Sequence, residues 1–183
     1  MERTMLKTAA AVYSTLRANT QTNRREHTMR LHMGIELEAP PETVWTYLVE
    51  PEKAMSWYTM LTVYRWTDDE RGPGATFYWE EEVRGKTYWN HFRTTEWTPN
   101  RVFAWEMTES SFFKGYTERW TIEPTETGCR FSFDDNLVFP YGLWGKVMGW
   151  FGERMARESS RQVLQNIKNL AESEARVGDT GNR

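Results

Sequence analysis

The sequence has no excess of basic charge and no long apolar run, and each absence excludes a class of protein. The formal net charge is −3 at pH 7, whereas a nucleic-acid-binding surface needs basic side chains to neutralise phosphates. No apolar stretch approaches the roughly 20 residues that a membrane-spanning helix requires. The sequence therefore predicts no nucleic-acid partner and no membrane span.

Cysteine and histidine are also scarce. The single cysteine, Cys129, cannot form an intramolecular disulfide, which is typical of a reducing compartment. The N-terminal stretch has basic residues but no continuous apolar segment, and Glu2 is atypical of a secretory signal, so we predict a cytoplasmic protein. His27, His32 and His91 do not form a metal-binding spacing with other ligands, and no glycine-rich nucleotide loop is present. We expect no metal and no cofactor.

Aromatic residues, in contrast, are abundant. Ten Trp, nine Phe and eight Tyr make up 15% of the chain. Each such side chain buries roughly 150–250 Å². The composition therefore predicts either a very aromatic core or a cavity lined with rings.

The chain divides into three segments. Residues 1–29 combine the pattern of a short amphipathic helix with a polar linker, and residues 176–183 form a polar tail. Residues 30–175 contain one strand, two helix starts marked by Pro41 and Pro51, six aromatic-rich strands with short turns, and a long amphipathic helix. This order predicts an α+β domain in which a curved, seven-stranded antiparallel sheet surrounds the C-terminal helix.

Alternation along the strands predicts which side chains face this helix. In the last strand Cys129, Phe131 and Phe133 alternate with polar residues and should point inward. If the turn before it places Ile122 opposite Cys129, Glu118 lies opposite Phe133 and shares its face. The two earlier hairpins give the same assignment, because the residues that they place opposite one another also point inward. Their expected pairs are Trp105 with Thr94, Met107 with Phe92, Phe77 with Phe92, and Trp79 with Asn90.

The predicted inner face carries a few polar side chains among its rings. They are Glu81, Glu96 and Asp135 near strand ends, where we expect them at a solvent-exposed rim, and Asn90, Thr94 and Glu118 within strands. A carboxylate such as Glu118 is costly to bury unless it is paired, hydrogen-bonded or protonated. Burial should raise the pKa of Glu118 unless the positive charge of Arg154 or Arg157 on the final helix stabilises the carboxylate. If one of these arginines pairs with it, we expect Glu118 to have a structural role.

Four stretches of the chain carry a family resemblance. They are IELEAPPETVWTYLVEPEKAMSWY, GATFYWEEE, TEWTPNRVFAWEM and GWFGERMARESSRQVLQNIKNLAE, and together they span residues 31 to about 173. They resemble the SRPBCC superfamily, also called START-like or Bet v 1-like, and within it the polyketide cyclase/dehydrase branch. The resemblance implies a helix-grip fold with a cavity for lipids, quinones, polyketides or similar apolar ligands. It transfers no catalytic residue, because the superfamily shares no catalytic motif.

We therefore predict a protein that binds or transports a hydrophobic small molecule between the sheet and the C-terminal helix. The residues expected to bind it are Phe77, Trp79, Asn90, Phe92, Thr94, Phe103, Trp105, Met107, Glu118, Trp120, Phe131, Phe133, Met148, Phe151 and Met155. One alternative is an enzyme of the cyclase/dehydratase type with Glu118 as acid or base. Another is a protein-interaction domain similar to the Hsp90-activating branch, which an outward aromatic patch would favour. The candidates for that patch are Tyr64, Trp66, Tyr78, Trp89 and Trp97.

Overall fold

The elements of the structure follow the predicted order. In the computed structural model residues 27–83, 85–139 and 143–180 are described, except for the side chains of residues 27, 143–156 and 179–180. The elements are β1 (His27–Leu37), α2 (Pro41–Val49), α3 (Pro51–Trp57), β2 (Leu61–Trp66), β3 (Thr76–Val83), β4 (Lys86–Thr98), β5 (Val102–Ser110), β6 (Gly115–Pro124), β7 (Cys129–Phe139) and α4 (Leu143–Thr180). β1 thus begins before the expected boundary at residue 30, and α4 continues past residue 175.

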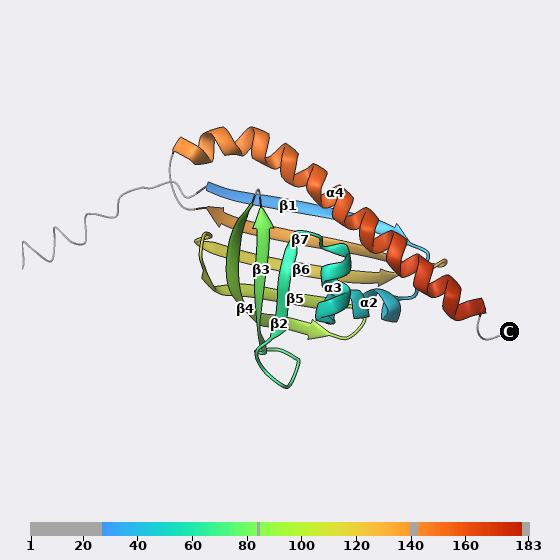
Figure 1. The fold of residues 1–183 in the computed structure, drawn as a ribbon. Helices are drawn as coiled ribbons and strands as arrows, with labels where there is room; N and C mark the ends of the chain where they lie inside the picture. Colours follow the sequence, from blue (N-terminus) through green and yellow to red (C-terminus); the bar gives the residue numbers. More distant parts are fainter. Residues whose placement is uncertain (1–26, 84, 140–142, 181–183) are drawn as a thin grey trace, which may run out of the picture.

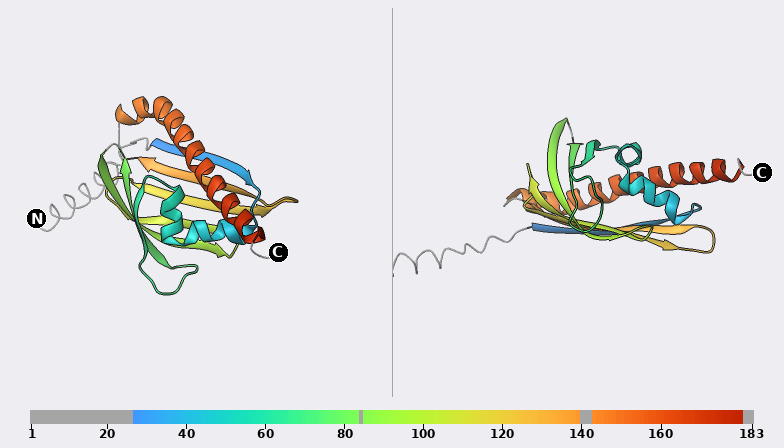
Figure 2. Two further views of the ribbon diagram at one scale, coloured as in Figure 1. Left: turned by 45° about the vertical axis from the view of Figure 1, so that its right-hand side comes forward. Right: turned by 90° about the horizontal axis from the view of Figure 1, so that it is seen from below.

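The seven strands form one antiparallel sheet in the order β1-β7-β6-β5-β4-β3-β2. The sheet is curved, and α2, α3 and α4 all lie on one side of it (Figures 1 and 2). With 38 residues, α4 is about 57 Å long and crosses the sheet diagonally. The predicted helix-grip fold is confirmed. No helix in the described part of the chain is long and apolar enough to cross a bilayer.

Local sequence signals set the ends of several elements. Pro41 and Pro51 occupy the first turns of α2 and α3, where a missing N–H costs no helical hydrogen bond. Gly85, with φ of 72°, turns the chain between β3 and β4, and Asn100, with φ of 61°, does so between β4 and β5. These left-handed conformations suit Gly and Asn, which accounts for the short connections of the meander.

Aromatic side chains fill the space between the sheet and α3. At most 2% of the surface of each is exposed, and they are Phe77, Trp79, Phe92, Phe103, Trp105, Trp120 and Phe131. Trp105 lies at their centre, with ring centroids 4.6 Å from both Phe103 and Trp120. Trp57 of α3 closes the cluster at 5.5 Å from Trp120. This half of the inner face is therefore a packed core.

The register of the sheet agrees with prediction in two hairpins and differs in the third. All four expected pairs of β3 with β4 and of β4 with β5 are confirmed. Ile122, however, lies opposite Phe131 and not Cys129. The strands pair as far as Pro124 and Cys129, and Thr125 N–H donates to the Gly128 carbonyl at 3.0 Å, so β6 continues two residues further before the turn than the predicted register required. The shift preserves the faces, but it places Glu118 opposite Asp135.

A bulge in β4 overturns another expectation. Thr94 pairs with Trp105 and Glu96 with Ala104, so two steps along β4 match one along β5. The extra residue turns Glu96 to the outer face, where Arg119 donates two hydrogen bonds to it. The prediction that Glu96 faces inward was therefore wrong.

The same bulge brings Trp97 to the inner face, where its ring lies 5.2 Å from that of Phe103. Tyr64 is also buried, and Trp66 packs 5.2 Å from Phe77. Of the five candidate outward aromatics, Tyr78 and Trp89 remain on the outer face, where both contact the ring of His91. Tyr64 belongs to the core, and Trp66 and Trp97 are partly buried and pack against it, which weakens the case for an outer aromatic patch.

Candidate functional site

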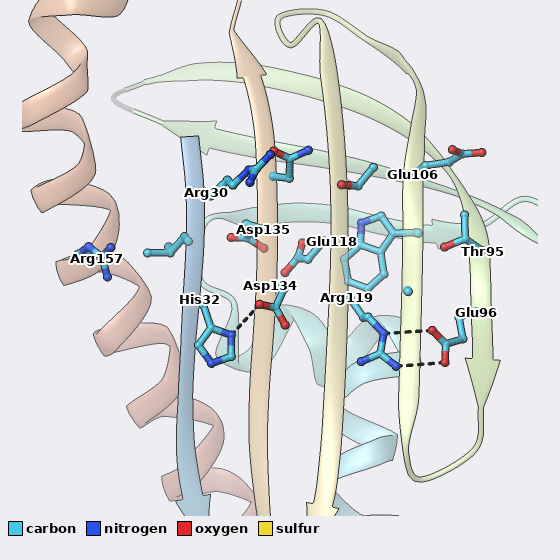
Figure 3. A pocket seen from close by; sticks show the side chains of 15 residues that line it. Arg30, His32, Thr95, Glu96, Glu106, Glu118, Arg119, Asp134, Asp135 and Arg157 are labelled. Atoms are coloured by element: carbon cyan, nitrogen blue, oxygen red, sulfur yellow. Dashed lines mark hydrogen bonds and ion pairs between the residues drawn. The ribbon is translucent and has the colours of Figure 1, made fainter. Parts of the chain in front are cut away.

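The described residues form a large hollow on the outer side of the sheet, and its chemistry is that of a paired, charged surface (Figure 3). It has a volume of about 690 Å³ and runs across β1, β7, β6, β5 and β4. His32 Nδ1 lies 2.6 Å from Asp134 Oδ1, and Arg119 binds Glu96 through two contacts of 3.1 Å. Because these exposed charges already pair with one another, the hollow does not suit the apolar ligand that the sequence predicts.

A smaller void lies on the inner side, between the sheet and the helices. It has a volume of about 50 Å³ and is lined by Trp57, Tyr58, Met60, Glu118, Trp120, Phe133, Asp135, Ser160 and Val163. A water molecule occupies about 30 Å³ of liquid, so the void matches one small polar group. Aromatic walls and buried carboxyls meet here, and we take this void as the candidate site.

Glu118 lies at the centre of the site. It is 7% exposed, and its neighbours two positions along β6 both donate hydrogen bonds to it: Tyr116 Oη to Oε2 at 2.5 Å, and Trp120 Nε1 to Oε1. Alternation places all three side chains on one face of the strand. Burial raises the pKa of Glu118 to about 7, although these hydrogen bonds and one from Asp135 act in the opposite direction. The carboxyl therefore changes charge near neutral pH.

Asp135 faces Glu118 from the neighbouring strand β7. Burial, followed by the charge of Glu118, raises the pKa of Asp135 well above its ordinary range. Two carboxyls in direct contact cannot both ionise cheaply, so the pair holds one proton between them. Asp135 Oδ1 is buried and has no hydrogen-bond partner, which leaves one oxygen of the pair available to a bound molecule.

A third carboxyl completes what we call the acid cluster: Glu81, Glu118 and Asp135. Glu81 is buried on β3, and Tyr58, which follows α3, donates a hydrogen bond to its Oε1 at 2.9 Å. Burial raises the pKa of Glu81, and the pKa of Tyr58 is raised by burial and by the cluster's charges. The expectation that Glu81 lies at a solvent-exposed rim was wrong, because Tyr58 and the strands around it enclose the carboxyl.

Other inner-face polar atoms also have no partner. Asn90 is completely buried, and neither its amide nitrogen nor its oxygen makes a hydrogen bond. The same holds for Thr94 Oγ1 and for the indole nitrogens of Trp79 and Trp105. An unsatisfied buried donor or acceptor costs about 1–3 kcal/mol. The inner face therefore offers several polar contacts to a molecule that can reach them.

The structure divides the predicted ligand-binding residues into groups. Glu118, Trp120 and Phe133 line the void; Phe77, Trp79, Phe92, Phe103, Trp105 and Phe131 belong to the packed core; Asn90 and Thr94 are buried polar residues of the inner face, and Met107 is partly buried. Met148, Phe151 and Met155 lie on α4, but their side chains, like that of Arg154, fall outside the described residues. Val163 and Ile167 of the same helix are buried, as its amphipathic pattern predicts.

Sequence reasoning missed the contribution of α3 to the site. Trp57, Tyr58 and Met60 line the void, yet the prediction drew its wall from the strands and α4 alone. The adjacent rings of Trp57 and Tyr58 at the end of a short helix next to the sheet were the available signal. Among the described residues, no group of His, Cys, Asp and Glu is placed to hold a metal ion.

Comparison with known proteins agrees with the fold. No curated protein matches the chain. A Thermus thermophilus protein superposes with a TM-score of 0.66 at 15% identity, covering 81% of this chain and 99% of its own. The aromatase/cyclase Zhui from Streptomyces sp. R1128 gives 0.65 at 16% identity, covering 80% and 94%. A START superfamily protein from Mycobacterium smegmatis gives 0.62 at 14% identity, covering 79% and 97%. A family model matches residues 28–172, and the chain therefore belongs to the family described as polyketide cyclase / dehydrase and lipid transport.

Proposed function

We propose that the protein binds an apolar small molecule on the inner face of the sheet, with the acid cluster holding the polar group of that molecule. One observation carries the proposal: a void next to Glu118 and Asp135 in which a buried carboxyl oxygen has no partner. Ligand pockets are typically apolar and use a few polar groups to orient the ligand. The family description, which includes lipid transport, supports the same reading. We infer a cytoplasmic location from the single, unpaired Cys129.

Binding is tested with Nile red, a neutral apolar dye, and tryptophan fluorescence. Trp57 and Trp120 line the void, so a saturable change in their emission at one dye per chain is the expected result. Native mass spectrometry of the protein purified from its own host should also show a bound small molecule that organic solvent extracts. Absence of both would count against the binding function. Glu106→Gln, on the outer face and paired with Arg93, is the matched control and should bind as the unmodified chain does.

A cyclase/dehydratase-type activity is the second candidate, and the state of Glu118 favours it. A carboxyl with a pKa of about 7 both accepts and donates protons at neutral pH. In the proposed step Glu118 removes a proton from the carbon next to a bound ketone, the C–H electron pair forms the enolate, and Glu118 returns a proton to that carbon. The fold similarity to the aromatase/cyclase Zhui supports testing this activity.

The enzyme reading is tested by incubating the protein with 1-acetonaphthone in D₂O and following deuterium incorporation into the methyl group by NMR. We expect exchange above the buffer rate, and its loss in Glu118→Gln while binding of the ketone persists. Binding without exchange would leave the protein as a carrier.

A further inference from the structure

Among the residues that the structure describes, the charged side chains that line the void are both carboxyls, Glu118 and Asp135. The third member of the acid cluster, Glu81, is connected to the void through the hydrogen bond that it accepts from Tyr58. Ion pairs elsewhere among the described residues use other carboxylates, for example Glu96 with Arg119 or Glu174 with Lys53. A ligand carboxylate would therefore meet repulsion here, whereas a cation would meet attraction in a setting with little water.

The walls of the void also suit a cation. Trp57, Tyr58, Trp120 and Phe133 surround the space beside Glu118 and Asp135. The face of an aromatic ring attracts a positive charge, and tryptophan does so most strongly. Rings together with carboxyls are a combination that recognises ammonium groups, and the volume of about 50 Å³ fits such a head group.

The surface next to the void is apolar. Leu137 lies two positions beyond Asp135 on β7, and Met33 of β1 lies opposite Phe133. Met33 is partly buried and packs against the core. An apolar body attached to an ammonium head at Asp135 would meet these side chains, and methionine adapts readily to ligands of different shape.

We propose that the preferred ligand is an apolar molecule with a protonated amine, which binds between the unpartnered Oδ1 of Asp135, Glu118 and the rings of Trp57 and Trp120. This inference rests on the proposed binding function and adds the chemical class of the ligand.

The test uses three probes that share one apolar body: 2-(1-naphthyl)ethylamine, 2-(1-naphthyl)ethanol and 1-naphthaleneacetate. Isothermal titration at pH 7.5 should show the amine binding at least about tenfold more tightly than the alcohol, and the acetate binding most weakly. A difference in affinity of about tenfold is the smallest that a hydrogen bond to a charged group typically provides. If none of the three binds, the proposed function fails as well. If the alcohol or the acetate binds as tightly as the amine, binding stands and the amine preference is refuted.

A paired variant locates the preference. Glu118→Gln with Asp135→Asn keeps the shape and removes the negative charge of the pair, so affinity for the amine should fall by about tenfold or more while affinity for the alcohol changes little. Glu106→Gln on the outer face should leave both unchanged. An equal loss for amine and alcohol in the paired variant would refute the assignment.

The pH dependence of the unmodified protein gives a readout that needs no variant. The titratable groups that line the void are Tyr58 after α3, Glu118 on β6 and Asp135 on β7, and hydrogen bonds link Glu81 to Tyr58 and Tyr116 to Glu118. From α4, Ser160 lines the void, and Arg157 lines the outer hollow together with Glu118 and Asp135. As pH rises from 5.5 to 8 the pair gains negative charge, so the amine should bind more tightly and the alcohol should not. A flat profile for the amine would overturn the proposal.

Discussion

Replacing Glu118 by Gln should change the stability of the protein in opposite directions at low and high pH. Burial raises the pKa of Glu118 from an ordinary value of 4.5 to about 7 in the folded state. Between these two values the unfolded chain releases the proton and the folded chain keeps it. The stability that the protonated carboxyl provides is therefore fully present below pH 4.5, decreases as pH rises, and is lost above about pH 7.

The size of this loss follows from the shift. One pKa unit corresponds to about 1.4 kcal/mol, so the carboxyl's titration removes about 3 kcal/mol of stability between pH 4 and pH 8. A Gln side chain cannot ionise, so the variant does not lose this stability as the pH rises. Gln, however, presents an NH₂ group where Tyr116 or Trp120 donates a hydrogen bond, and this mismatch costs about 1–3 kcal/mol at every pH. The charge of Glu118 also raises the pKa of Asp135, so its removal favours the variant further at high pH.

The expected result is a difference in unfolding free energy that changes sign. Glu118→Gln should be less stable than the unmodified chain at pH 4.5 and more stable at pH 8, with the crossing between them. Urea denaturation followed by tryptophan fluorescence at several pH values measures the difference directly, and melting temperatures should reverse their order as well. Glu106→Gln is the control, because that carboxylate pairs with Arg93 on the outer face. A constant difference at all pH values would show that Glu118 does not titrate in the folded protein near neutrality, and the reasoning about the acid cluster would be wrong.

Three further results are expected. Burial, with the charge of Glu42, raises the pKa of Cys129 to about 11, so iodoacetamide at pH 8 should label this thiol only after denaturation. Intact-mass measurement shows the labelling, and rapid labelling of the folded chain would contradict the burial of Cys129. Gly128→Ala should lower the unfolding free energy by about 1–3 kcal/mol or more in urea, because its Cβ would lie 2.1 Å from the Leu37 carbonyl oxygen, whereas Gly72→Ala, with nothing within 4 Å, should be neutral. Removal of residues 1–26 keeps all of β1 and should move the melting temperature by only a few degrees in calorimetry; a larger fall would assign that segment to the folded domain.

The fold was predictable because the sequence repeats the same signals in every element. Period-two alternation, proline at helix starts and residues such as Gly85 at turns each favour one local structure. In the first two hairpins these signals also fixed the register, so Trp79 was correctly paired with Asn90 and Trp105 with Thr94. Short loops leave few alternative pairings, which explains this success.

The site was less predictable, and the reasons are local. The loop between β6 and β7 admits more than one length, so Glu118 was paired with Phe133 when its partner is Asp135. A two-residue slip keeps every side chain on its face and therefore leaves no sign in the alternation. The bulge that turns Glu96 outward is equally invisible, because no glycine or proline marks it. Alternation predicts the face of a side chain, whereas the partner across the strand depends on the exact loop.

The acid cluster is hard to explain by stability alone. One half of the inner face is filled by rings around Trp105, so this sheet can clearly pack a dry aromatic core. Next to these rings, with Glu118 directly opposite Trp105, three carboxyls have raised pKa values, and each raised pKa means lower stability at neutral pH. Apolar side chains of similar size at these positions would remove that cost. Groups that perturb one another's protonation in this way are typical of functional sites, and residues that lower stability are commonly those that function requires. The contrast between the packed aromatic core and the carboxyls beside it therefore favours a ligand-binding role for this face of the sheet.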